Sequence, residues 1–373
     1  MRILVQLGNL GNSVTSHLVE PIARVTNVTE IMLVTKKPGP GIDKVKYYCP
    51  PGFLGSLPVA AVICEFVILI VLAVFKRPDF IAGYLLFPHG IMAYITAKFT
   101  RKPVVLSIIA GPVELFSIGS PSHFDHNAEL TLYGKCMLAV LRKANAVITT
   151  GSFTRDFLIK HRVPGRKIFP IICYPDFERY YPVYNSIKYD VILVGRLEKV
   201  KNIETALLAF REVKNIIPDF KACILGDGPC RKQLEKTTRT LGLKNNLAFP
   251  GFRHDVNSYL NKSRVFLLSS KREGFPNVYL EALLCGLPAV VSNCGDITSI
   301  ARDGYNAFII NDASDYKAFA AAITSLLTDE GLYQCMAGNV RTAAASLVPA
   351  DNTASWVEVI RHIRASFSDN QKW

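Results

Sequence analysis

The sequence lacks the patterns that mark disulfide-stabilised, zinc-binding and nucleic-acid-binding proteins. Its nine cysteines are odd in number and form no Cys-x-x-Cys pair, which favours reduced, buried thiols in a cytoplasmic protein. No secretory signal peptide, internal repeat or Asp-x-Asp pair is present. The pair His123 and His126 has no further ligands nearby, so it indicates a polar loop rather than a metal site.

Acidic residues are scarce relative to basic ones, and the formal net charge is +13. Residues 1–185 hold 20 Lys and Arg against 11 Asp and Glu, so most of the excess lies in the first half. This bias suits an anionic partner: a phosphorylated substrate, a membrane surface or a nucleic acid. Because no RNA- or DNA-binding signature accompanies the charge, we expect no nucleic acid partner.

The length of 373 residues suggests two domains, each with its own core. Apolar strand candidates alternate with helical stretches in both halves, which predicts two doubly wound, parallel α/β domains facing a cleft. A Tyr- and Pro-containing stretch from Tyr174 to Ser186 is the predicted linker. We therefore expect domains at 1–185 and 186–350, followed by a C-terminal helix and tail at 351–373 that pack back on the first domain.

The run from Leu57 to Phe75 is almost continuously apolar and ends in Lys76-Arg77. Nineteen residues are enough to span a bilayer, but Glu65 near the middle is costly in hydrocarbon. The sequence therefore favours a buried or interfacial helix over a spanning one. Either position suggests proximity to a membrane.

The segment from Glu273 to Pro288 predicts a loop that becomes a helix. Pro276 suits the first helical turn, Gly286 suits a C-terminal cap, and Pro288 ends the helix before an apolar strand. A helix start attracts phosphate because its backbone N–H groups are unpaired. The two carboxylates, Glu273 and Glu281, bracket this start; taken alone, a solvated loop charge and a solvated helix carboxylate fit equally well.

Two further loops follow predicted strands and are expected at the same sheet edge. The loop Gly195-Arg-Leu-Glu-Lys-Val-Lys201 offers a guanidinium fork in Arg196 and a mobile charge in Lys201, a pair that suits a diphosphate. The turn Gly226-Asp-Gly-Pro229 is a weak nucleotide signal by itself. Together with the carboxylates, the three loops describe a site for a ligand with both phosphates and hydroxyls, as in a nucleotide sugar.

The order of these motifs resembles the retaining glycosyltransferase family 4, of GT-B fold. The matching motifs are Val-Gly-Arg-Leu-(x3)-Lys, Leu-Gly-Asp-Gly-Pro, Pro-Gly-Phe, Glu-Gly-Phe-Pro-(x4)-Glu-Ala, Gly-Leu-Pro-Ala-Val and Asp-Gly-Tyr-Asn. The resemblance covers residues 189–330 and extends more thinly into the first half.

The resemblance implies roles for particular residues. Arg196 and Lys201 would bind the donor diphosphate, and Glu273 would hold the sugar hydroxyls. Glu281 would accept hydrogen bonds from the ribose. The remaining donor contacts would come from the loops at Gly11, Phe252, Arg253, Gly274, Phe275 and Asn277.

One position departs from the family pattern. Many members carry a His just before a Gly after the strand that is predicted here at Val104–Ile109, where this chain has Ala110. His89 and Glu114 are the candidate replacements for sugar or acceptor contacts. Loops at Lys36–Cys49 and Phe116–Glu129 are the expected acceptor-selecting segments.

The resemblance thus implies a retaining glycosyltransferase that moves a sugar from a nucleoside diphosphate to a glycan or lipid-linked acceptor. We expect it in the cytoplasm, in peripheral contact with the inner face of the cell membrane, with no cofactor and no metal. The alternatives are a GT-B epimerase or phosphorylase, and a non-catalytic basic protein that binds a membrane or nucleic acid.

Overall fold

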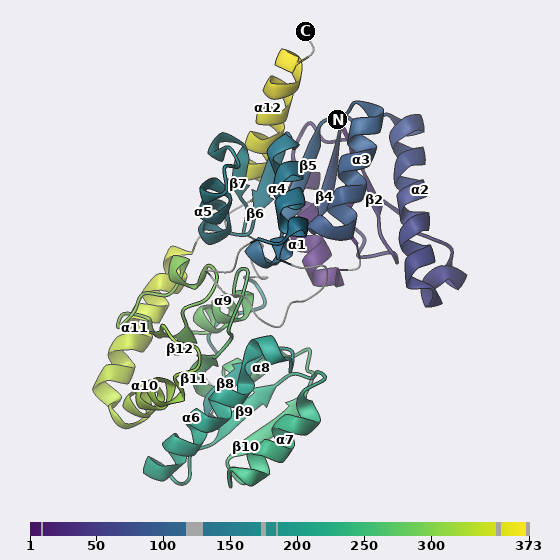
Figure 1. Ribbon diagram of the computed structural model, residues 1–373. Coiled ribbons are helices and arrows are strands. Elements are labelled where there is room, and N and C mark those ends of the chain that lie inside the picture. The colour runs from purple at the N-terminus through teal and green to yellow at the C-terminus, as the bar shows by residue number, and fades with distance from the viewer. Residues whose placement is uncertain (9, 117–129, 173–176, 184–185, 348–351, 371–373) are drawn as a thin grey trace. The chain divides into compact units, whose positions relative to one another are not determined.

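The computed structural model describes residues 1–8, 10–116, 130–172, 177–183, 186–347 and 352–370. They form two compact units, each built around its own sheet (Figure 1). Residues 1–116, 130–172 and 352–370 belong to the first unit, and 177–347 to the second. Residues 177–183, assigned above to the first domain, thus group with the second unit.

The first unit contains a seven-stranded, wholly parallel sheet in the order β3-β2-β1-β4-β5-β6-β7. Most of its strands are buried on both faces, as is typical of parallel sheets. The strands are β1 (Arg2–Gln6), β2 (Glu30–Val34), β3 (Val45–Tyr48), β4 (Phe80–Tyr84), β5 (Val104–Ile108), β6 (Ala146–Thr149) and β7 (Ile168–Pro170).

Helices cover both faces of this sheet, each with its own core cluster. One cluster includes residues of α2 (Pro58–Lys76), α3 (Ile91–Thr100), α4 (Leu132–Lys143) and α5 (Ser152–Lys160). The other includes residues of α1 (Asn12–Arg24) and α12 (Asn352–Asn370). The C-terminal helix therefore completes the core of the first unit, through Trp356, Val359, Ile360 and Ile363.

The second unit has a six-stranded parallel sheet in the order β10-β9-β8-β11-β12-β13. Its strands are β8 (Tyr189–Val194), β9 (Ala222–Leu225), β10 (Leu247–Gly251), β11 (Ser263–Leu268), β12 (Ala289–Ser292) and β13 (Ala307–Ile310). Its helices are α6 (Ile203–Ile216), α7 (Arg231–Thr240), α8 (Val256–Leu260), α9 (Asn277–Leu284), α10 (Tyr316–Thr328) and α11 (Glu330–Ser346).

Each sheet has a topological switch point beside its first strand. The chain leaves β1 for β2 on one side and returns to β4 on the other, and it does the same from β8 to β9 and then β11. In doubly wound proteins, the loops at the carboxyl ends of the two flanking strands part at such a point and leave a crevice that binds ligands. The predicted pair of doubly wound domains is confirmed. Its topology predicts ligand sites at the two switch points.

Some local predictions were wrong or incomplete. The segment Lys36–Cys49 contains an edge strand, β3, rather than loop alone, and β7 and α11 were not predicted. All eight cysteines in the described residues are free, as expected, but Cys136 and Cys335 are exposed rather than buried. The predicted loop Phe116–Glu129 lies outside the described residues, apart from its first position.

We expect the docking of α12 to be essential for the first unit. Trp356 is 1% exposed within its core, so Trp356→Ala should lower the free energy of unfolding by about 3–5 kcal/mol. Urea denaturation followed by circular dichroism measures this change. The neighbouring Val357 is 37% exposed and provides the control. A loss below about 1 kcal/mol for Trp356→Ala would show that α12 adds little stability.

Candidate functional site

The switch point of the second sheet lies between two loops, one after β8 and one after β11. The Ser269 hydroxyl donates to the Lys201 carbonyl at 3.0 Å, and the Lys271 N–H donates to the Val200 carbonyl at 2.9 Å. These bonds hold the loops side by side. The predicted phosphate loop and the predicted carboxylate loop therefore meet at the carboxyl ends of the central strands.

Lys201 and Glu273 form an ion pair across this point. Lys201 Nζ lies 2.7 Å from Glu273 Oε1, and the Ser270 hydroxyl donates to the same oxygen at 2.6 Å. The Lys201 and Glu273 side chains are only 21% and 13% exposed. Because the carboxylate is fixed by a cation and a hydroxyl, it is presented in one orientation. The sequence did not indicate the contribution of Ser270.

The Glu273 loop is also fixed from behind, by a turn that was not predicted. Gly295 has φ +58°, and a Cβ there would lie 2.4 Å from the Glu273 carbonyl oxygen. The Asp296 N–H donates to the Gly274 carbonyl at 3.1 Å. Any side chain at position 295 would therefore displace the Glu273 backbone.

Helix α9 begins at Asn277, with Pro276 as the residue before it. Pro276 was predicted in the first turn and lies one position earlier, while Gly286 has φ +85° and ends the helix as predicted. Asn277 Oδ1 is buried without a hydrogen-bond partner among the described residues. A helix start with an unsatisfied amide therefore lies next to the Glu273 loop.

A pocket of about 510 Å³ opens on the other side of β8. Its volume is within the usual range for small-molecule sites, about 300–1,000 Å³. Arg196 lines it and is 75% exposed, with Nη2 2.6 Å from Glu198 Oε1. The structure thus brings Arg196 together with Phe252 and Arg253 in the lining of one pocket. The full lining comprises Val194, Gly195, Arg196, Leu225, Gly226, Asp227, Phe252, Arg253 and Val256.

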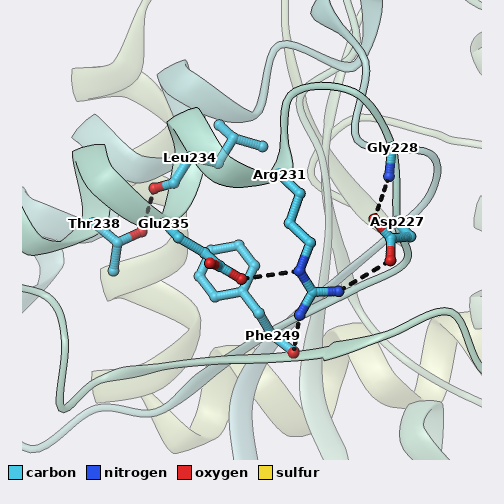
Figure 2. A network of polar contacts seen from close by, with 7 residues as sticks. All are labelled: Asp227, Gly228, Arg231, Leu234, Glu235, Thr238 and Phe249. Atoms are coloured by element: carbon cyan, nitrogen blue, oxygen red, sulfur yellow. Dashed lines mark hydrogen bonds and ion pairs between the residues drawn. The ribbon is translucent and has the colours of Figure 1, made fainter.

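Arg231 anchors Asp227, one of the lining residues, through a network of polar contacts (Figure 2). Its guanidinium bonds Asp227 Oδ2 at 3.2 Å, Glu235 Oε1 at 2.9 Å and the Phe249 carbonyl at 2.9 Å. It therefore ties the β9–α7 turn to β10. Sequence reasoning missed Arg231: Asp227 and Glu235 lie four residues to either side of it, but only the fold brings the Phe249 carbonyl to its guanidinium.

Glu281 lies one turn inside α9, and it is paired rather than solvated. Burial raises its pKa to about 7, while a hydrogen bond from Tyr180 and the charge of Arg179 lower it. Tyr180 is itself buried. The Val183 N–H donates a hydrogen bond to Asn261 Oδ1, and Asn261 Nδ2 donates one to the Tyr181 carbonyl. The segment 177–183, part of the predicted linker, therefore packs on the second unit and covers Glu281.

The remaining predicted site residues, Glu114, His89 and Gly11, lie in the first unit. Glu114 accepts three backbone hydrogen bonds, each 2.7 Å long, from Leu86, Ile109 and Ala110. Burial raises its pKa to about 7, although these bonds lower it. Glu114 thus ties the loops after β4 and β5 together, and the backbone of Ala110 takes part.

His89 lies at the switch point of the first sheet. Its Nδ1 is 3.1 Å from Gln6 Nε2 and 3.7 Å from Glu65 Oε2, and burial lowers its pKa to about 4. A Cβ at Gly8 would lie 2.6 Å from the ring, so glycine is required there. A Cβ at Gly11 would meet no atom within 4 Å. Because the pKa of His89 is about 4, its imidazole is neutral at physiological pH, and Gln6 and Glu65 are its polar neighbours.

No group of three or more His, Cys, Asp or Glu side chains within the described part of the chain is placed to hold a metal ion. His123 and His126 lie outside it.

Known proteins share both the fold and the motif-bearing segment. The chain superposes on Anabaena HepE, solved with UDP-glucose, with a TM-score of 0.70 at 19% identity over 99% of this chain and 100% of that one. It superposes on the sucrose-phosphate synthase of Thermosynechococcus elongatus with a TM-score of 0.75 at 17% identity over 98% and 100%. The chain therefore has the GT-B fold.

Residues 182–343 match the family model of glycosyl transferases group 1. A further similarity is to the UDP-Gal:alpha-D-GlcNAc-diphosphoundecaprenol alpha-1,3-galactosyltransferase of Escherichia coli, at 34% identity over 152 residues. That match covers 40% of this chain and 39% of the relative. The second unit is therefore similar to the glycosyl transferases group 1 family over this segment.

Removing the Arg231 guanidinium should loosen the pocket wall. We expect Arg231→Met to lower the free energy of unfolding by about 1–3 kcal/mol, because the Phe249 carbonyl and Asp227 lose a charged donor. Urea denaturation measures the change, with Lys232→Met on the exposed side of α7 as the control. Equal stability of both variants would contradict the positioning role.

Glu281 should make the protein less stable as pH rises. Its carboxyl is protonated in both states below its ordinary pKa of 4.5, and the folded state resists ionisation up to about pH 7. At 1.36 kcal/mol per pKa unit, this group loses about 3 kcal/mol of stability across that window. Glu281→Gln should lessen the fall in stability between about pH 5 and 8 by about 3 kcal/mol and leave the part due to Glu114, whereas Asp219→Asn should not change it. An unchanged slope in Glu281→Gln would contradict the raised pKa.

Proposed function

We propose that this protein is a retaining glycosyltransferase that transfers a sugar from a nucleoside diphosphate, with uridine diphosphate as the first candidate, to a lipid-linked glycan. The carrying observation is the Lys201–Glu273–Ser270 cluster at the switch point of the second sheet, beside the pocket lined by Arg196. The cluster offers an oriented carboxylate for hydroxyls, and the two cations offer charge for phosphates.

Each group suits one part of such a donor. The Glu273 carboxylate accepts hydrogen bonds from the sugar hydroxyls, with the N–H groups around Gly274, Phe275 and Asn277 at the sugar and phosphates. Lys201 and Arg196 stabilise the negative charge that develops on the diphosphate as the glycosidic bond breaks. Glu281 accepts the ribose hydroxyls, which requires its carboxylate form, and the pocket at Phe252 and Arg253 takes the base.

The retaining mechanism follows from positioning rather than from a pair of acid and base carboxylates. The leaving phosphate accepts the acceptor proton on the same face of the sugar. Because Arg196 and Lys201 supply the positive charge at the diphosphate, we expect neither a metal nor another cofactor. NMR of the product tests retention: its new anomeric bond should have the configuration of the donor, and inversion would contradict the mechanism.

The acceptor side rests on two observations. The first half of the chain carries most of the excess positive charge, and the similar E. coli enzyme is named for a diphosphoundecaprenol acceptor. We therefore propose a lipid diphosphate acceptor and a location in the cytoplasm, at the inner face of the cell membrane. In the first unit, His89 and Glu114 are the candidate sugar or acceptor contacts, and Gly11 is a candidate donor contact.

Donor binding is testable by thermal shift against UDP-, GDP- and ADP-sugars, because a ligand that binds only the folded state raises the melting temperature.

Arg196→Ala should lower turnover about 100-fold or more, since a cation aimed at the developing charge is lost. Its exposed side chain makes misfolding an improbable cause, and Arg211→Ala on α6 is the matched control. Glu273→Gln should lose the preference for the UDP-sugar over UDP, with Asp219→Asn as its control.

Turnover of Arg196→Ala and Glu273→Gln within about twofold of wild type would contradict the enzyme proposal. Product analysis separates the alternatives. A transferase releases UDP only when an acceptor is present, a phosphorylase requires phosphate, and an epimerase converts the nucleotide sugar without any acceptor.

A further inference from the structure

We propose that the outward side of α2 docks the protein on an anionic phospholipid surface, with the helix lying in the membrane plane. This inference deepens the lipid-linked acceptor of the proposed function. It rests on residues of the first unit alone, so it can fail while donor binding by the second unit stands.

The exposed side chains of α2 are apolar up to its last residue and lie on one side of the helix. We call them the α2 face: Val59, Ile63, Val67, Val71, Val74 and Phe75. Ile95 and Phe99 are also exposed on α3, which packs beside α2 (Figure 1). Soluble proteins rarely leave a continuous apolar surface of this length facing water, so the α2 face requires a partner.

The inward side of α2 shows why the helix lies flat rather than spanning. Leu69, Leu72 and Ala73 are buried in the core of the first unit. Glu65 is buried with them, and its Oε2 accepts a hydrogen bond of 2.8 Å from Gln6 on β1. Insertion across a bilayer would break this bond and expose the sheet. By length and composition alone, α2 is the one helix in the described residues able to span a membrane, and these contacts keep it on the sheet.

The charge around the α2 face selects a partner of negative sign. Lys76 and Lys98, near the C-terminal ends of α2 and α3, are exposed, as are Arg77 and Arg101 just beyond. Between residues 51 and 102 the acidic residues are Glu65 and Asp79. Glu65 faces inward, and Asp79 accepts the Arg2 N–H at 2.6 Å. The nearby Glu30 is paired with Lys46 at 2.8 Å. The surplus charge is therefore cationic.

A lipid surface fits this combination better than a second copy of the chain. A symmetric dimer would bury the same face twice and bring like cations to one interface, which is unfavourable. An amphipathic helix in a membrane interface buries apolar side chains below the headgroups and leaves Lys and Arg at the phosphates.

The test is sedimentation of the full chain with vesicles of phosphatidylcholine, with or without about 30% phosphatidylglycerol. We expect binding to the anionic vesicles that weakens with salt. The double variant Ile63→Glu/Val67→Glu should lower the bound fraction at least about tenfold, because two charges enter the apolar interface. The matched control is Ile216→Glu on α6 of the second unit, since Ile216 is 63% exposed and Ile63 is 59% exposed. Lys76→Glu/Lys98→Glu should lose only the preference for anionic vesicles.

Three results would overturn the proposal: no vesicle binding by the wild type, binding that the double variant retains, or resistance to alkaline carbonate extraction, which marks a spanning helix. A concentration-dependent dimer abolished by the double variant would instead assign the face to a second copy. UDP-sugar thermal shifts measured on the same variants should stay unchanged. They separate a failure of docking from a failure of donor binding.

Discussion

The ion pair between Lys201 and Glu273 is the contact on which the second unit depends. At the switch point the loops after β8 and β11 leave the sheet, and this ion pair joins them together with the Ser269–Lys201 and Lys271–Val200 hydrogen bonds. The pair and Ser270 set their spacing with charges that are mostly removed from water. Loss of either partner leaves the other charge uncompensated, which costs more than the pair contributes. The second unit is therefore stiff where a donor would bind, and sensitive to single substitutions there.

The same topology has different chemistry in the first unit. Gln6, Glu65 and His89 meet beside β1 as Lys201 and Glu273 meet beside β8. Burial raises the pKa of Glu65 and lowers that of His89, so both groups are biased toward their neutral forms. A polar site of low charge suits hydroxyls rather than phosphates. The two switch points thus differ in the charge of the side chains that meet there.

Sequence reasoning reached the parts that local patterns determine. Buried parallel strands such as β8 and β11 are continuous apolar runs, and the motif order placed Arg196, Lys201 and Glu273 on neighbouring loops. The short edge strands β3 and β7 were not predicted, because β3 is only half-buried and β7 ends in proline. The partners of Glu281, Arg231 and Glu273 escaped as well. Tyr180, Phe249 and Gly295 are distant in sequence, and only the fold brings them into contact.

Glu65 illustrates how one residue acquires a different meaning in three dimensions. In the sequence it argued against membrane insertion, because a carboxylate is costly in hydrocarbon. In the structure it faces β1, so it places no charge on the α2 face and fastens the helix to the sheet. The carboxylate contacts the same Gln6 and His89 that form the first switch point. An apolar surface and a polar site are thereby built on opposite sides of one helix.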